Sequence, residues 1–325
     1  MRNQILFFVL SVLALAAFSS PSYAGTYLGS WDLRGDGQRD LVYRESFGIR
    51  VLQPNGNRRD YSLGNTAWSL FGAYDTDGND GAELVLKAGE DVVIIDHAYQ
   101  SIRRYPVGSM AWSIVRAADL TSDGADELIV RFGNSLRIIS DENSSQRDIH
   151  FPGNDSWTLV DLADLSGNGL DLIISKPGGV RIVDPRLPRY KDFNFSGFSE
   201  YYGVADLGKS GLQVIGRTST ELYVITGGRN GSVKRYPITT GQSWAIYQRT
   251  ADTDGRSGEE VIIILPSSIK VVSHRSGTVR TYDFQSNYTI DVVQDMDGRS
   301  GDEIVVALSN GTVRIVYDRG GRVGN

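Results

Sequence analysis

The sequence has no cysteine, and its 325 residues include only three histidines. The absence of cysteine excludes disulfide bonds and thiol chemistry. No segment shows the period of 3.6 residues typical of an amphipathic helix, and no nucleophile-elbow, zinc or phosphate-loop motif occurs. The chain must therefore be stabilised by an apolar core, by hydrogen bonds or by bound metal.

Long apolar runs are also scarce. The run at the N-terminus, Ile5 to Phe18, is too short to span a bilayer comfortably. It follows Arg2 and precedes Ser22-Tyr23-Ala24, the small-residue pattern of a secretory cleavage site. Residues 1–24 are thus predicted to be a signal peptide. We expect an exported protein, periplasmic or extracellular, with no transmembrane segment.

Basic residues are not in excess, because the formal net charge is −6 and both signs are scattered along the chain. Proteins that bind nucleic acid usually carry a basic patch. We therefore expect no nucleic-acid partner. An exported chain without cysteine is more typical of bacteria than of eukaryotes, and we expect a monomer.

What the sequence does contain is a repeat of about 43 residues. An Asp-rich stretch such as "DLRGDGQRDLV" recurs seven times, at spacings of 42 to 46 residues. The seven copies begin at Asp32, Asp75, Asp119, Asp164, Asp206, Asp252 and Asp295. A steady period of this length indicates a chain built from one supersecondary unit.

Each repeat holds four short β-branched or aromatic runs separated by turn residues, the pattern of a four-stranded antiparallel sheet. Arranged radially, such sheets cover one another's apolar faces. We predict an all-β fold, a seven-bladed β-propeller over residues 25–325. The competing open β-solenoid would need shorter units and terminal caps. The last repeat reaches Asn325 where its outer strand should begin, so we expect a stunted strand there and ring closure by blade packing.

An Asp-rich loop between two strands, repeated seven times in a secreted chain, resembles the FG-GAP or VCBS repeat family, the propeller of the integrin α-subunit head. The resemblance covers residues 25–325. It implies calcium bound by the loop that joins the first two strands of a blade, in the pattern Asp-x-Asp-x-Asp-Gly-x-x-Asp. The chemistry agrees, because Ca²⁺ takes roughly six to eight oxygen ligands and side chains at alternate positions of a tight loop converge.

Five loops offer such oxygens. The candidate metal ligands are Asp75, Asp77, Asn79 and Glu83 in repeat two; Asp119, Thr121, Asp123 and Glu127 in repeat three; Asp252, Asp254 and Glu260 in repeat six; Asp295, Asp297 and Glu303 in repeat seven; and Asp32, Asp36 and Asp40 in repeat one. Repeats two and three are expected to be the best sites, because Arg34, Arg256 and Arg299 intrude on the other three. Repeat four is one residue short, and repeat five has lost most of its acids. The alternative is that the aspartates only cap turns by accepting backbone N–H bonds.

An aromatic residue precedes the loop in most repeats. The five at the start of the first strand are Trp68, Trp112, Trp157, Trp244 and Tyr288. The preferred interpretation for any one of them is a core residue between blades. The second interpretation is a rim of rings that binds a sugar or a peptide, which resembles the lectin branch of the same family.

These features favour a non-enzymatic, calcium-stabilised module that binds carbohydrate or protein at the envelope or outside the cell. A polysaccharide-active enzyme of the lyase kind and a purely structural envelope scaffold are the alternatives. Arg34-Gly35-Asp36 also matches the tripeptide that integrins read. When the seven copies of the loop are aligned, only Arg34 departs from the pattern, so we interpret the tripeptide as a chance match within a repeat loop.

Overall fold

Seven four-stranded antiparallel sheets make up the protein. The computed structural model describes residues 25–153, 156–187, 189–196, 199–209, 211–238, 242–248 and 250–324. The predicted signal peptide lies outside these ranges. In every sheet the four strands follow one another in sequence order, and each sheet, or blade, contains one repeat loop between its first two strands. The all-β class and the seven blades predicted from the repeat are confirmed.

The strands fall into four sets by their place in the blade. The inner strands of blades 1 to 7 are β1 (Thr26–Trp31), β5 (Trp68–Tyr74), β9 (Trp112–Ala118), β13 (Thr158–Ala163), β17 (Ser199–Ala205), β21 (Ala245–Ile246) and β25 (Tyr288–Gln294). The second strands are β2 (Asp40–Glu45), β6 (Glu83–Ala88), β10 (Glu127–Phe132), β14 (Asp171–Lys176), β18 (Gln213–Thr218), β22 (Val261–Ile264) and β26 (Glu303–Leu308).

The third strands are β3 (Gly48–Leu52), β7 (Asp91–Asp96), β11 (Ser135–Ser140), β15 (Gly179–Asp184), β19 (Glu221–Thr226), β23 (Ser268–Ser273) and β27 (Val313–Tyr317). The outer strands are β4 (Arg58–Ser62), β8 (Ser101–Pro106), β12 (Ser145–His150), β16 (Arg189–Asn194), β20 (Ser232–Pro237), β24 (Thr278–Asp283) and β28 (Arg322–Gly324). Within the described ranges two short 3₁₀ turns complete the elements, η1 (Gly228–Asn230) and η2 (Asp318–Gly320). The three residues of β28 match the stunted outer strand expected for the last blade.

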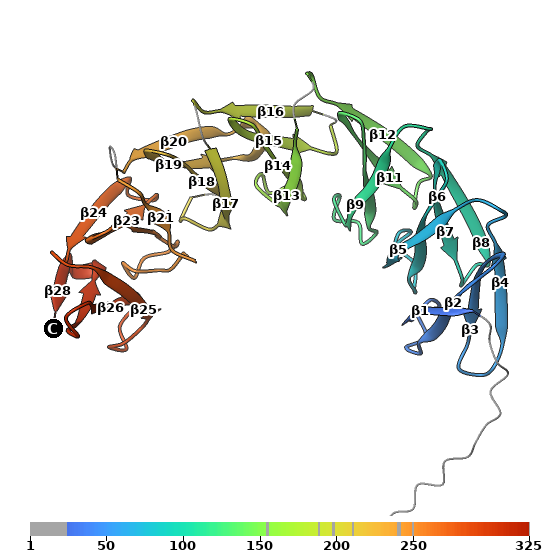
Figure 1. The fold of residues 1–325 in the computed structure, drawn as a ribbon, viewed down its shortest axis with the longest axis horizontal. Coiled ribbons are helices and arrows are strands. Elements are labelled where there is room, and N and C mark those ends of the chain that lie inside the picture. Colours follow the sequence, from blue (N-terminus) through green and yellow to red (C-terminus); the bar gives the residue numbers. More distant parts are fainter. Residues whose placement is uncertain are drawn as a thin grey trace, which may run out of the picture.

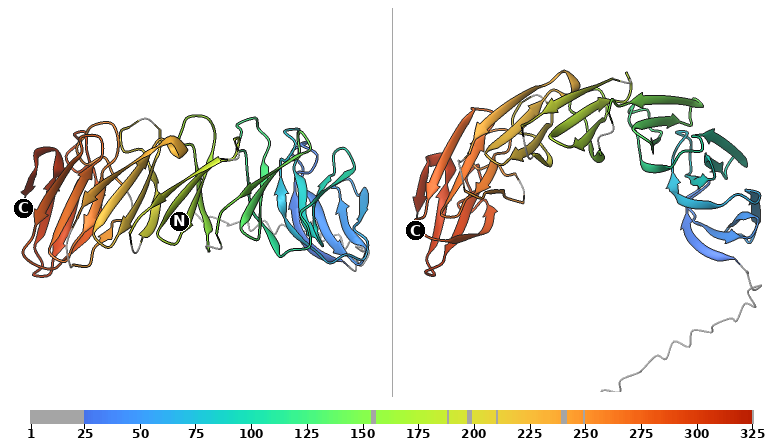
Figure 2. Two further views of the ribbon diagram at one scale, coloured as in Figure 1. Left: turned by 90° about the horizontal axis from the view of Figure 1, so that it is seen from above. Right: turned by 45° about the horizontal axis from the view of Figure 1, so that its top comes forward.

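The blades follow an arc, with the inner strands on its concave side and the outer strands on its convex side (Figure 1). Blades 1 and 7 lie at opposite ends, so the arc is open and the expected closure of the ring is not seen (Figure 1). Seen from above, the sheets stand side by side along the arc (Figure 2). No helix in the described ranges is long and apolar enough to cross a membrane.

The second and third strands are nearly continuous apolar runs because both of their faces are buried. In β6, Leu84 and Leu86 pack toward blade 1, while Val85 packs toward blade 3. Six apolar clusters result, one between each pair of neighbouring blades. The core is therefore distributed along the arc, and each blade is buried by its neighbours.

A cation from one blade clamps the tryptophan of the next at four of these junctions. Arg131 illustrates the geometry: its guanidinium carbon lies 4.1 Å from the centre of the Trp157 ring, and its Nη1 donates to the Trp157 carbonyl at 2.8 Å. The same pairs elsewhere are Arg44 with Trp68, Lys87 with Trp112, and Arg217 with Trp244. Each clamp adds a cation–π contact and a charged hydrogen bond to the apolar packing.

A second link is made by buried tyrosines. The hydroxyl of an outer-strand tyrosine bonds a polar side chain in the turn before the next blade's outer strand. The pairs are Tyr61 with His97, Tyr105 with Asp141, Tyr236 with His274, and Tyr282 with Asp318. At the junction of blades 3 and 4, the corresponding turn residue is Pro185 and the corresponding outer-strand residue is Ile149. The outer-strand residue of one blade and the turn residue of the next are therefore either both polar or both apolar.

Replacing Arg131 by Met should lower the free energy of unfolding by about 2 kcal/mol, because both the ring contact and the hydrogen bond to Trp157 are lost. Chemical denaturation measures the change. The matched control is Arg189→Met on the exposed outer strand β16, which should cost less than about 0.5 kcal/mol. Equal losses in the two variants would contradict the clamp.

The Tyr236–His274 link should make stability depend on pH. Burial, with Lys234 and Lys209 nearby, lowers the pKa of His274 to about 4. Between the unfolded value near 6.5 and about 4, the unfolded chain binds the proton and the folded chain does not, so stability falls as the pH falls. The expected loss at pH 5 is about 2 kcal/mol. Urea midpoints at pH 7 and pH 5 should differ less in His274→Asn than in the wild type, and an unchanged difference would contradict the assignment.

Candidate functional site

Neighbouring repeat loops contact each other along the row of blades. The carbonyl of the first aspartate accepts an N–H from the following loop at four junctions: Asp32 from Ala82, Asp75 from Asp126, Asp206 from Glu259, and Asp252 from Asp302. Glycine permits this approach. A Cβ on Gly258, whose φ is +102°, would lie 2.3 Å from the backbone of Gly208. The candidate metal loops are thus held by the stacking of the blades.

Each loop is also closed by its own acids. The last acidic or amide side chain accepts the backbone N–H of the second loop residue, as Glu83 does from Thr76 at 2.7 Å and Glu260 from Thr253 at 2.9 Å. The first aspartate accepts N–H groups further along the loop, as Asp252 does from Gly255 at 2.8 Å. The turn-capping function proposed as the alternative to metal is therefore present.

Capping does not use all of the oxygens. In loops 2, 6 and 7 three carboxylates each offer an oxygen within 4.8 Å of the other two. These sets are Asp75, Asp77 and Glu83; Asp252, Asp254 and Glu260; and Asp295, Asp297 and Glu303. Oxygens grouped this closely suit a hard cation such as Ca²⁺. In loop 6 the backbone caps use one oxygen each of Asp252, Asp254 and Glu260, so capping there is compatible with metal binding.

Loop 3 does not form such a group of three carboxylates. Asp119 uses both oxygens for capping, Oδ1 for Ser122 and Asp123 and Oδ2 for Gly124. Thr121 donates to Asp123 at 2.6 Å. The pKa of Glu127 is still raised to about 7, mainly by burial, as are those of Glu83 and Glu260.

Loop 1 contains its own cation. Arg34 forms ion pairs with Asp36 at 2.8 Å and with the fully buried Asp40 at 3.2 Å. Both carboxylate oxygens of Asp32 accept hydrogen bonds from the backbone N–H groups of Arg34, Asp36 and Gly37. The guanidinium therefore occupies the acidic loop. It also joins the Arg and Asp of the Arg34-Gly35-Asp36 tripeptide to each other in an ion pair.

The three carboxylate clusters differ in the charges that surround them. In loop 2, Arg103 pairs with Asp77 at 3.0 Å. In loop 7, Arg299 is exposed and lies 3.8 Å from Asp297. The ion pairs found in the described part of the chain do not include the carboxylates of loop 6, and Arg256 is exposed.

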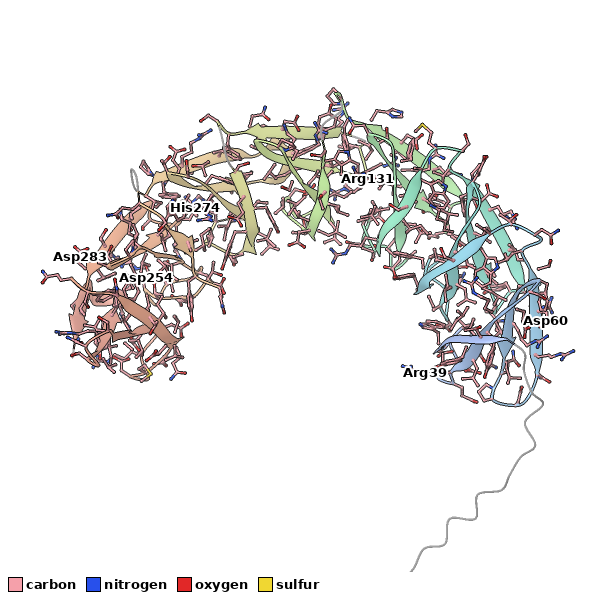
Figure 3. All side chains as sticks on the ribbon, viewed as in Figure 1. Arg39, Asp60, Arg131, Asp254, His274 and Asp283 are labelled. Atoms are coloured by element: carbon pink, nitrogen blue, oxygen red, sulfur yellow. The ribbon has the colours of Figure 1, made fainter. Side chains whose placement is uncertain are left out.

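Loop 6 therefore has the greatest unbalanced negative charge. Asp254 and Glu260 are 5% and 3% exposed, and Figure 3 places Asp254 within the body of the last two blades. Burial raises the pKa of Asp252, and the neighbouring Asp254 adds to that rise. A divalent cation would remove the repulsion, so the residues present fit calcium best at loop 6.

The tryptophans proposed as ligand-binding residues lie mostly between blades. Trp112, Trp157 and Trp244 are 7%, 3% and 6% exposed, and each belongs to a core cluster. Trp68 and Tyr288 are partly buried against such clusters. Trp244 and Tyr288 line one open cavity of about 390 Å³. The cationic clamps that cover the faces of four of the rings could not be read from a single repeat.

Comparison with known proteins shows only distant likenesses. No family model matches the sequence, and no curated protein matches it. Among solved structures, a lectin from Agrocybe aegerita that recognises non-reducing terminal N-acetylglucosamine is 15% identical, covering 93% of this chain and 79% of that one, with a TM-score of 0.35. A streptogramin B lyase is 9% identical, covering 90% and 93%, with a TM-score of 0.34. Dipeptidyl peptidase 4 of Porphyromonas gingivalis is 8% identical, covering 93% and 52%, with a TM-score of 0.40. We transfer no ligand or activity from these likenesses.

Removing calcium should lower the melting temperature of the protein, and Asp254→Asn should reduce this response. The substitution removes one ligand and one repelling charge, so the variant in EGTA should be at least as stable as the wild type in EGTA. Thermal melts in EGTA and in excess calcium measure both effects. Asp283→Asn on the exposed outer strand β24 is the matched control (Figure 3). A wild-type curve that does not respond to calcium would leave turn capping as the sole function of the loops.

Proposed function

We propose that this protein is an exported, calcium-stabilised binding module for carbohydrate or protein, without catalytic activity. The observation that carries the proposal is the repeated grouping of three carboxylates in loops that also hold neighbouring blades together. Calcium would join the loop carboxylates and so stiffen the loop row without taking part in chemistry. Extracellular modules of this type bind calcium with dissociation constants of about 0.1–1 mM, which suits the periplasm or the cell exterior better than the cytosol.

The histidines support a binding function more than a catalytic one. His97 and His274 are buried and bonded to tyrosines, and His150, on an outer strand, bonds Ser135 of the third strand of the same blade. The buried carboxylates of the loops are engaged in capping and in the clusters. The polar groups that usually act as acids and bases are thus occupied in holding the fold.

Carbohydrate is the ligand class that we place first. Trp244 and Tyr288 line one open cavity together with Ser243 and Asn287, and aromatic rings beside hydrogen-bonding side chains suit ligands rich in hydroxyl groups. A propeller also presents several similar junctions, so weak contacts at separate junctions would add up on a polymeric ligand.

The mature protein should bind at least one glycan on an array, and binding should weaken after treatment with EGTA because the loop row loses its cations. The array is read with and without calcium, beside Asp254→Asn and the Asp283→Asn control. Binding to no glycan under any condition would contradict the carbohydrate form of the proposal. Capture of a single envelope protein by the same sample would then favour the protein-binding form.

A further inference from the structure

The two ends of the arc carry the two halves of a blade junction. At each of the six internal junctions, one blade packs on the following blade through a single apolar cluster. In the described chain, blade 7 has no following blade and blade 1 has no preceding blade. The surface of blade 7 that points away from blade 6 includes Met296 and Val313, and is called here the end face of blade 7. The surface of blade 1 that points away from blade 2 includes Tyr27 and Leu41, and is called the end face of blade 1.

The end face of blade 7 exposes two side chains that the other six blades bury. Val313, in the third strand, is 49% exposed, and Met296, the second residue of loop 7, is 48% exposed. Their counterparts in the other blades are at most 1% exposed: Ile49, Val92, Leu136, Val180, Leu222 and Ile269 in the third strands, and Leu33, Thr76, Leu120, Leu165, Leu207 and Thr253 in the loops. The apolar counterparts lie in the clusters shared with the following blade. Val313 and Met296 therefore occupy positions that a following blade normally covers.

The end face of blade 1 shows the complementary exposure. Leu41, in the second strand, is only partly buried. Its counterparts are fully buried in the clusters shared with the preceding blade: Leu84, Leu128, Leu172, Val214, Val261 and Ile304. Tyr27, in the inner strand, is 54% exposed and contacts Tyr43 edge to face. Contiguous apolar surface of this kind marks an interaction site in soluble proteins.

A cavity at the end face of blade 7 corresponds to a smaller one inside the arc. At the junction of blades 3 and 4, loop 3 and its neighbouring strands line a cavity of about 70 Å³, and Pro185 of blade 4 forms part of the wall. The corresponding cavity of blade 7, between Asp297 and Glu303 of loop 7 and Tyr317, has a volume of about 440 Å³. Within the described residues its lining comes from blade 7 alone. The turn of a following blade would fill the difference.

The residues at the two ends match an internal pair. Leu120 of loop 3 and Pro185 in the turn of blade 4 line the same cavity. Met296 and Pro54 hold these two positions in blade 7 and blade 1, and both are exposed. Where the loop residue is polar, it donates to an aspartate in the following turn: Thr76 to Asp141, and Thr253 to Asp318. The two ends therefore carry the apolar form of the pair on both sides.

The backbone groups that join neighbouring loops are also present at the ends. At four junctions, the carbonyl of the first aspartate of one loop accepts the N–H of the eighth residue of the next loop. Asp295 is the first aspartate of loop 7, and Arg39 is the eighth residue of loop 1. Figure 3 places Arg39 on blade 1, at the end of the arc. Apolar surface, cavity and backbone groups thus supply the parts of a seventh junction, divided between two ends.

We propose that the end face of blade 7 binds the end face of blade 1 of a second copy of this chain. Met296 packs on Pro54 of the partner subunit, and the Asp295 carbonyl accepts the N–H of Arg39 of the partner subunit. Both ends of the arc point to the same side (Figure 1), so two copies related by a two-fold axis make both contacts at once and the assembly closes. Closure within one chain would instead have to increase the curvature at six junctions that are already packed. The dimer replaces the monomer expected from the sequence and does not depend on the ligand of the proposed function.

Light scattering after size-exclusion chromatography should give the mature protein twice the mass of one chain. Val313→Arg places a charge in the end face of blade 7 and should reduce the mass to that of one chain. Because Val313 is exposed in a single copy, the variant should keep the circular dichroism spectrum of the wild type. Val279→Arg, at an exposed valine of outer strand β24, is the matched control and should remain dimeric. A wild type with the mass of one chain, or a control that dissociates as Val313→Arg does, would overturn the contact.

Cross-linking distinguishes a second copy from closure within one chain, and the cysteine-free sequence makes it specific. Met296→Cys and Pro54→Cys are co-expressed as separate chains, one with a size tag, and treated with a short bismaleimide. A product that contains one chain of each kind is expected, because the two cysteines can then meet only between copies. A double variant that cross-links only within single chains, without the mixed product, would show that the arc closes on itself. That result, or no cross-link in either sample, would overturn the proposal.

Discussion

A four-stranded sheet of this protein has two apolar faces and can bury neither by itself. Packing each face on the neighbouring sheet is the constraint on which the remaining structure depends, because the second and third strands are apolar on both sides. The clamps are additions to this packing. Arg131 covers Trp157, and Tyr105 reaches Asp141, only because the sheets that carry them are already in contact.

The loops depend on the same packing. Asp141 belongs to blade 3, yet it accepts a hydrogen bond from Thr76 in loop 2, and Thr76 in turn bonds Glu83 of the carboxylate cluster. Asp318, Thr253 and Glu260 repeat this arrangement between blades 6 and 7. In both cases the side chain that completes the surroundings of a cluster comes from the following blade. The position of the candidate metal ligands is therefore a property of the junction rather than of one loop.

Much of the fold could be predicted from the sequence, because the repeat spacing and the apolar runs report directly on blade number and strand burial. The choice among loops could not. Loop 3 has as many acids as loop 2, but Asp119 uses both oxygens for backbone N–H groups, and this depends on loop dihedrals that residue types do not specify. Arg256 was expected to intrude on its loop and is exposed, whereas Arg34 does fill its loop.

The clamps also determine how the protein would respond to force. The four cation–tryptophan clamps and the four tyrosine links each join blades that are adjacent in the chain, and none of them bypasses a blade. Tension applied along the arc would pass through each junction in series, so the weakest junction would yield first and leave the others intact. Clamps with both a ring contact and a hydrogen bond, such as Arg131 on Trp157, then resist the separation of the two blades that they join. Under shear the protein would lose its shape blade by blade instead of all at once.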